Sequence, residues 1–149
     1  MKDFPSYMRS VSDSLPVLFV SALMYHISRL LTLRHDGTGL PASNSRYIWI
    51  LLGIYLFMSQ LTFWADHGEV SLVGVVVELI PLFILRTLLG YVKKLRAFSG
   101  YLLIGIGIQS LFLLMMALGG HGGHEVDFFM NTWCFLAYMR LLLRLPKEE

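Results

Sequence analysis

The sequence predicts an all-α protein, an integral membrane bundle of four or five transmembrane helices that forms a single domain over residues 1–149. Of its 149 residues, 56% are hydrophobic and only 15% are charged, whereas about 25% of the residues of a typical soluble domain are charged. The apolar residues form long runs that short polar segments separate. Composition and run length therefore place the chain in the membrane class.

Two of the apolar segments, residues 47–64 and residues 101–118, carry no charged side chain. A transmembrane helix needs about 20 mostly apolar residues, so we expect each segment to cross the bilayer. Residues 70–92 and residues 126–145 are also long enough, although both contain a few charged side chains. We expect these two segments to span as well, which gives four transmembrane helices.

A fifth segment, residues 15–33, is the least certain to span. Its uncharged run stops at Ser28 because Arg29 follows, and a run of about 14 residues is often interfacial or re-entrant. The segment can still span if the Arg29 side chain snorkels to the membrane surface. The sequence leaves both possibilities open, a spanning helix or a re-entrant one.

Lysine and arginine residues mark one side of the membrane. All twelve except Lys2 and Arg9 lie in or beside the loop 34–46, the loop 93–96 and the C-terminal tail, and the turns at 65–69 and 119–125 contain none. Because basic loops stay in the cytoplasm, we expect a cytoplasmic C-terminus and two external turns. The location that we expect is the inner membrane of a bacterium.

A shift of 54 residues aligns residues 45–95 with residues 99–149 without a gap and pairs identical residues at twelve positions. The most informative pairs are Gly53 with Gly107, His67 with His121 and Arg86 with Arg140. We interpret the two stretches as duplicated helical hairpins of the same orientation, packed about an axis along the membrane normal and preceded by an N-terminal segment, residues 1–44. The alternative is a pattern common to membrane helices: an interfacial aromatic residue, an apolar run and a basic end.

Glu78 has the highest expected free-energy cost of insertion into a membrane in this chain, because it stands near the middle of an apolar segment. An ionised carboxylate there costs at least about 2.5–3.5 kcal/mol on membrane-insertion scales. Pro81 follows, and since proline has no N–H to donate, the carbonyl of Val77 loses its helical partner. We predict either a carboxyl that carries a proton or cation, with His26 or Arg29 as partner of its ionised form, or a buried protonated glutamate that locks two helices together.

Other polar residues interrupt the apolar segments. We expect Arg86 and Arg140 to snorkel towards the cytoplasmic headgroups, and the alternative is a symmetric site for an anionic lipid or substrate. His26 could ligate haem only beside a second histidine in the membrane, and the other four histidines lie in loops. Three polar stripes with helical spacing should face the interior of the bundle. They are Ser21, Tyr25, Ser28 and Thr32; Tyr55, Ser59, Thr62 and Asp66; and Asp127, Asn131, Cys134 and Tyr138.

Histidine and acidic residues gather in the two turns that we expect to be external. Imidazole and carboxylate groups are ligands of zinc, copper and nickel, and a glycine-rich turn could bring His121 and His124 to one ion. His67 and Glu125 complete this candidate set. No standard metal-binding spacing is present, so we predict no cofactor, with a divalent metal as the alternative. A solvated polar turn explains the same residues.

The sequence favours a non-enzymatic membrane subunit that acts as a scaffold, sensor or regulator of a membrane complex. A single cysteine, Cys134, excludes an internal disulfide, and neither a nucleophile–base pair nor a nucleic-acid signature is present. We expect the lipid bilayer and either another membrane protein or a second copy of the chain as partners. The alternatives are a small proton- or cation-coupled transporter or channel centred on Glu78, and an external metal-binding protein.

Overall fold

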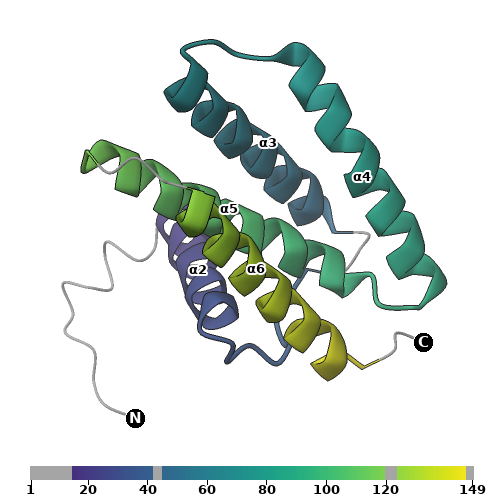
Figure 1. The fold of residues 1–149 in the computed structure, drawn as a ribbon. Helices are drawn as coiled ribbons and strands as arrows, with labels where there is room; N and C mark the ends of the chain where they lie inside the picture. The colour runs from purple at the N-terminus through teal and green to yellow at the C-terminus, as the bar shows by residue number, and fades with distance from the viewer. Residues whose placement is uncertain (1–14, 42–44, 120–123, 147–149) are drawn as a thin grey trace, which may run out of the picture.

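The structure is a computed structural model that describes residues 15–41, 45–119 and 124–146. These residues contain five helices and no strand, so the prediction of an all-helical protein is confirmed. The helices in chain order are α2 (Leu15–Leu31), α3 (Arg46–His67), α4 (Leu72–Tyr91), α5 (Arg96–Ala117) and α6 (His124–Arg144) (Figure 1).

Three of the described helices, α3, α4 and α5, are long and apolar enough to cross a membrane. This confirms the membrane-helix prediction for three of the five expected segments. The helix α6 has 21 residues but carries charged side chains at both ends, and α2 is apolar but has only 17 residues. At about 1.5 Å per residue, α2 is some 25 Å long, a little less than the hydrocarbon core of about 30 Å.

Local sequence signals set the ends of the first long hairpin. The Ser45 hydroxyl accepts a hydrogen bond from the N–H of Tyr47 at the start of α3, and the Ser71 hydroxyl accepts one from the N–H of Gly74 at 2.9 Å in α4. Serine is a favoured N-cap because its oxygen satisfies a free N–H of the first turn. Gly68 ends α3 in the left-handed region, with φ +76°, which costs glycine little.

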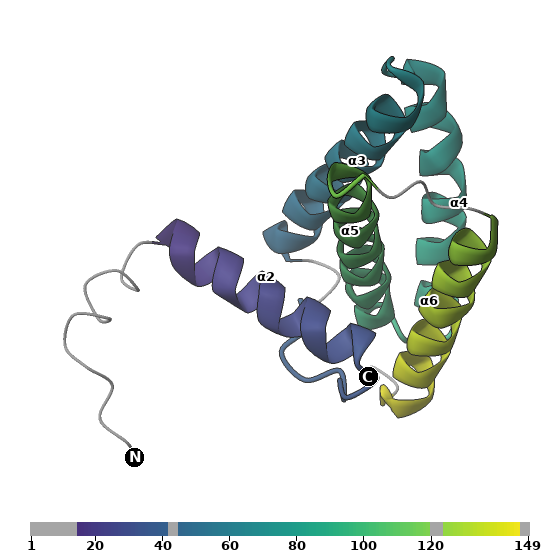
Figure 2. The ribbon, with the colours of Figure 1, turned by 60° about the vertical axis from the view of Figure 1, so that its left-hand side comes forward.

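The helix α5 forms the centre of the bundle and contacts α2, α3, α4 and α6 (Figure 2). Its first half is buried, and glycines let its neighbours approach closely. A Cβ atom at Gly100 would lie 2.2 Å from Cδ2 of Leu141 in α6, and one at Gly107 would lie 2.6 Å from Cγ2 of Ile27 in α2. Close packing therefore holds α2, α5 and α6 together.

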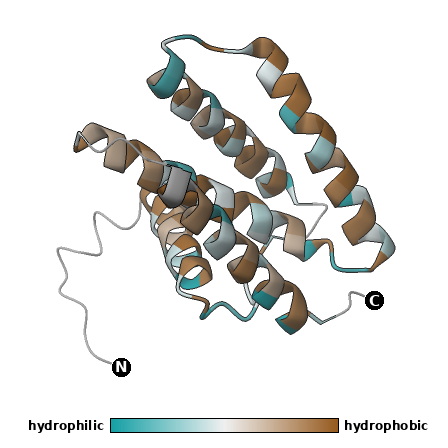
Figure 3. Ribbon diagram, in the orientation of Figure 1, coloured by the Kyte–Doolittle hydropathy of each residue, from teal (hydrophilic) through white to brown (hydrophobic). Residues whose placement is uncertain are grey.

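The exterior of the bundle is apolar, as lipid rather than water would require. The clearest case is α4, which is coloured as hydrophobic over most of its length in Figure 3. Leu72, Val73 and Phe83 of this helix are each more than 70% exposed. A water-soluble monomer rarely exposes so large a contiguous apolar surface.

The basic segments lie together at one end of the bundle (Figure 1). The Lys94 ammonium, in the turn between α4 and α5, donates a hydrogen bond to the carbonyl of Leu142 near the end of α6. The Ser99 hydroxyl lies 3.2 Å from the carbonyl of Pro41 in the loop before α3. This end of the bundle is called the basic end below. The turn between α3 and α4 lies at the opposite end.

Candidate functional site

The Glu78 carboxyl is held between two helices that are long enough to span a membrane. The Ser59 hydroxyl of α3 donates a hydrogen bond to Oε2 of Glu78 in α4 at 2.6 Å. The Tyr55 hydroxyl, one turn earlier on α3, lies beside both Glu78 and Tyr101. Glu78 follows Leu72 by six residues, which places it about 9 Å along the axis of α4. The carboxyl therefore stands well inside the apolar length of the helix.

The expected partners His26 and Arg29 do not contact Glu78. Nη1 of Arg29 donates to the hydroxyl of Tyr25 at 2.6 Å and Nη2 donates to the carbonyl of Arg34 at 3.2 Å. That expectation is wrong because α2 packs on α5 and α6, whereas α4 packs on α5 and presents Glu78 to α3. Partners on the same helix or in the following loop are closer to Arg29 than any group on α4.

A polar cavity of about 400 Å³ lies between α3, α5 and α6. Its polar lining residues are Tyr55, Tyr101, Gln109, Asn131, Cys134 and Tyr138. Oε1 of Gln109 and the hydroxyl of Tyr138 are buried and meet no hydrogen-bond partner among the described residues. A buried polar atom without a partner costs about 1–3 kcal/mol. A cavity of this size can hold water or a small polar ligand that satisfies both atoms.

A second cavity, of about 260 Å³, continues this polar space away from the basic end. It is lined by Ser59 and Thr62 within α3 and by Asp66 and His67 at the end of that helix. Gln109 lines both cavities, and Ser59 is the residue that binds Glu78. A chain of polar side chains therefore leads from the α3–α4 turn to the Glu78 carboxyl and on to the inner cavity.

Buried side chains of α5 and α6 lie between the inner cavity and the basic end. On α5, Ala97 and Ser99 are 0% exposed and Phe98 is 3% exposed. After the cavity residue Tyr138, Leu141 of α6 and Leu145 just beyond this helix are 1% and 5% exposed. The polar lining residues of the two cavities thus extend towards the α3–α4 turn, whereas buried side chains of α5 and α6 lie towards the basic end.

Two of the three predicted polar stripes line this space and the third does not. Tyr55, Ser59, Thr62 and Asp66 line one cavity or the other, and so do Asn131, Cys134 and Tyr138; the Asp127 side chain lies outside the described residues. Ser21, Tyr25, Ser28 and Thr32 are exposed instead. The hydroxyls of Ser21, Ser28 and Thr32 donate to carbonyls of their own helix, so they need no partner in the interior.

The predicted metal ligands are only partly described. The His67 side chain is exposed at the end of α3, with Nδ1 at 3.3 Å from Oδ2 of Asp66. His121 and the side chains of His124 and Glu125 lie outside the described residues. Among the residues that are described, no three histidine, cysteine, aspartate or glutamate side chains come together as a metal site.

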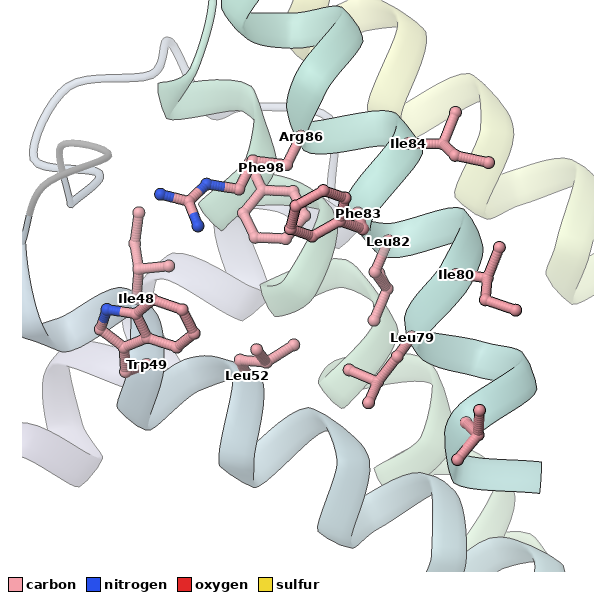
Figure 4. Close-up of a pocket in the computed structure, with 11 residues that line it drawn as sticks. Ile48, Trp49, Leu52, Leu79, Ile80, Leu82, Phe83, Ile84, Arg86 and Phe98 are labelled. Carbon is pink, nitrogen blue, oxygen red and sulfur yellow. The ribbon is translucent and has the colours of Figure 1, made fainter. Parts of the chain in front are cut away.

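Arg86 and Arg140, which the 54-residue shift pairs, have different surroundings. Arg86 lies at one end of a groove of about 510 Å³ between α3 and α4, and its guanidinium carbon is 5.6 Å from the ring centroid of Trp49 (Figure 4). Arg140 is exposed on α6 and does not line this groove. The two arginines therefore do not form one symmetric site.

A histidine pair that the sequence analysis missed joins α2 to the following loop. The N–H of Gly37 donates to Nδ1 of His35 at 2.8 Å, so a neutral His35 carries its proton on Nε2. That nitrogen lies 2.7 Å from Nδ1 of His26 and donates to it. Burial, helped by His26 and Arg29, lowers the pKa of His35 below its ordinary 6.5. In the sequence His35 lies in a polar loop, and only the return of that loop onto α2 buries its side chain.

This direct contact also bears on the haem hypothesis for His26. A second histidine does lie beside His26, but the two rings are hydrogen-bonded to each other and their centroids are 5.0 Å apart. An iron between them would need both nitrogens as ligands in place of this bond. The pair is therefore a structural link in this arrangement rather than a pair of axial ligands.

Comparison of the chain with protein-family models, with curated proteins and with solved structures found no match.

Proposed function

We propose that this protein is a non-enzymatic membrane subunit that binds a proton or a small cation at Glu78 and transmits that event to another membrane protein. The observation that carries the proposal is the polar approach to Glu78 from one end of the bundle. Polar side chains extend from the α3–α4 turn to the Ser59 hydroxyl that binds the carboxyl, and buried side chains of α5 and α6 lie on the side of the basic end. Such a site would be loaded from the side of the α3–α4 turn.

The proposed orientation follows from the basic end. Because lysine and arginine residues favour the cytoplasm, the basic end faces the cytoplasm and the turn between α3 and α4 faces outward. This places the C-terminus inside and opens the polar space to the exterior, as in the inner membrane of a bacterium. In this arrangement α3, α4, α5 and α6 span the bilayer, and α2 spans it obliquely or enters it only in part.

The partner surface is proposed on α3, around Gly53. A Cβ atom at this glycine would meet no atom within 4 Å, and Ile50 and Phe57 on the same side are 48% and 66% exposed. Small residues on a transmembrane helix allow a second helix to approach closely. The same helix carries Ser59 and Tyr55 beside Glu78, so a change at the carboxyl would reach the partner directly.

Affinity purification in mild detergent followed by mass spectrometry tests the proposal. We expect one other membrane protein to co-purify in near-equal amount with the native chain, and Gly53→Leu to remove it. The control is Ala22→Leu, a similar increase in size at an exposed position of α2. Recovery of the chain alone, or equal losses with both variants, would contradict the proposal.

A second function, proton or cation transport by the chain alone, is supported by the polar cavities that meet at Gln109. Reconstituted liposomes with an internal pH dye separate the two functions. A transporter gives ion-dependent flux that Glu78→Gln abolishes and that Glu69→Gln, at an exposed acid in the α3–α4 turn, does not change. A subunit with a one-sided site gives no flux above that of empty liposomes.

A further inference from the structure

We infer that the groove between α3 and α4 binds an anionic phospholipid, with one acyl chain in the groove and the headgroup phosphate at Arg86 (Figure 4). The argument is independent of the role proposed for Glu78, because Glu78 does not line this groove. It requires only that the bundle lies in a bilayer.

The lining of the groove suits a flexible hydrocarbon chain better than a helix. Apart from Arg86, every lining residue is isoleucine, leucine, valine, phenylalanine or tryptophan. Helices that pack closely in membranes use glycine, alanine, serine or threonine at their contact, and the groove offers none of these. An acyl chain has no backbone polar groups to satisfy and can follow the branched side chains.

The length of the groove matches one leaflet of a bilayer. Its lining on α4 runs from Val76 to Arg86, a separation of ten residues that corresponds to about 15 Å along the helix axis. The hydrocarbon core of a bilayer is about 30 Å thick, so the groove covers roughly the depth of one leaflet. A lipid of that leaflet would place its headgroup at the Arg86 end and its acyl chain along α4.

The charge at the mouth of the groove selects the headgroup. Arg86 forms no ion pair with any described residue, and its guanidinium faces the Trp49 ring across the groove. Arginine over an aromatic face is held in place while its N–H groups stay available to a phosphate. Trp49 belongs to the first turn of α3, next to Arg46, so the mouth lies at the basic end, where interfacial aromatic residues anchor helices.

Fluorescence quenching by brominated lipids tests the inference in liposomes. The reporter is the Trp64→Phe/Trp133→Phe chain, which keeps Trp49 as its single tryptophan. A minor fraction of phosphatidylglycerol with brominated acyl chains is mixed into unbrominated phosphatidylcholine, and brominated phosphatidylcholine is used at the same fraction for comparison. We expect the apparent affinity for the anionic lipid to be about fivefold higher, which is the enrichment expected for one basic side chain at a membrane surface.

Three variants of the reporter chain complete the test. Arg86→Gln should remove the preference for phosphatidylglycerol, whereas Arg140→Gln, at the aligned position outside the groove, should keep it. Leu52→Phe, which narrows the groove from α3 and leaves Arg86 in place, should weaken quenching by both lipids. Inorganic phosphate in the buffer should not compete, because the acyl chain supplies much of the binding.

Other outcomes would overturn the inference. Equal quenching by the two lipids in the reporter chain would show that the headgroup is not selected. Weak quenching by both would show that protein, such as a second copy of the chain, covers the groove. Loss of the preference in Arg140→Gln as well as in Arg86→Gln would assign it to overall charge, and competition by inorganic phosphate would assign the site to the free anion.

Discussion

The two long hairpins of this protein, α3 with α4 and α5 with α6, differ in how tightly they close. In the second hairpin, Gly100 of α5 leaves room for Leu141 of α6, which is 1% exposed. In the first, a groove of about 510 Å³ lies between the helices. The hydrogen bond between Ser59 and Glu78 joins them near the end that carries the α3–α4 turn. Close side-chain packing joins α5 to α6, whereas a side-chain hydrogen bond joins α3 to α4.

The aligned residues of the two hairpins differ in their surroundings. Gly53 and Gly107 are identical, yet a Cβ atom would meet nothing within 4 Å at the first and would overlap Ile27 at the second. Tyr47 is 57% exposed, whereas the aligned Tyr101 packs against the ring of Tyr138. Identical residues at aligned positions therefore have different packing environments in the two hairpins.

The largest expected effect is the loss of the closed hairpin in Leu141→Ala. Truncation of a buried leucine costs about 2–5 kcal/mol of unfolding free energy in soluble proteins, and we expect a value near 2 because lipid also solvates the unfolded chain. The control is Thr87→Ala at the aligned, exposed position of α4, which should change little. Unfolding by sodium dodecyl sulfate titration measures both, and equal effects would show that the hairpins are equally closed.

The second effect contrasts the aligned glycines. Gly107→Ala should destabilise the bundle by about 1–3 kcal/mol, because the added methyl group overlaps a packed side chain. Gly53→Ala should be neutral or stabilise it by up to about 1 kcal/mol through helix propensity. The same detergent titration measures both variants. Similar values would remove the structural difference between the two positions.

The third effect tests the polar contact of the open hairpin. Ser59→Ala should lower the unfolding free energy by about 0.6 kcal/mol and by no more than about 1.7, the range measured for hydrogen bonds between membrane helices. Ser110→Ala is the control, since its hydroxyl donates to a carbonyl of its own helix. Distances between spin labels on α3 and α4 should widen in Ser59→Ala alone; unchanged distances would show that another contact holds the hairpin.

The smallest expected effect is a pH dependence confined to the attachment of α2. His35 has a lowered pKa in the folded protein, so the unfolded chain binds a proton at higher pH than the folded one. Its contribution to stability is complete above about pH 6.5 and is lost as the pH falls below that value. Hydrogen exchange at pH 8 and pH 5 should show loosening of residues 32–40, absent in His35→Phe. The exposed His67→Gln should not alter this loosening.

Much of the helical framework could be predicted from hydropathy and charge. Residues 47–64 were expected to span, and α3 runs from Arg46 to His67. The helix α5 begins at Arg96, five residues before the predicted segment. The prediction was too short because hydropathy identifies only the apolar part of a helix. Apart from Phe98, residues 96–100 are polar or small, yet all five are helical, and all except Arg96 are buried.

The candidate site was less predictable, because it depends on which helices touch. Glu78 could be identified from its cost in a membrane, but its partner Ser59 depends on the pairing of α3 with α4. The exposed stripe on α2 has the same spacing as the stripes that line the cavities, so spacing alone cannot separate the two cases. Gln109 was missed because it belongs to none of the polar stripes. The signal that could have identified it is its side-chain amide within the apolar segment 101–118.

The bond from Lys94 to the carbonyl of Leu142 joins residues that are far apart in the order of synthesis. During translation, the turn between α4 and α5 is made well before its acceptor exists. The bond can therefore form only after residue 142 has been synthesised and α6 has folded against α5. Until then the Lys94 ammonium lacks this acceptor, and the face of α5 that packs against α6 is uncovered. The folding of α6 against α5 is therefore the step that completes the bundle.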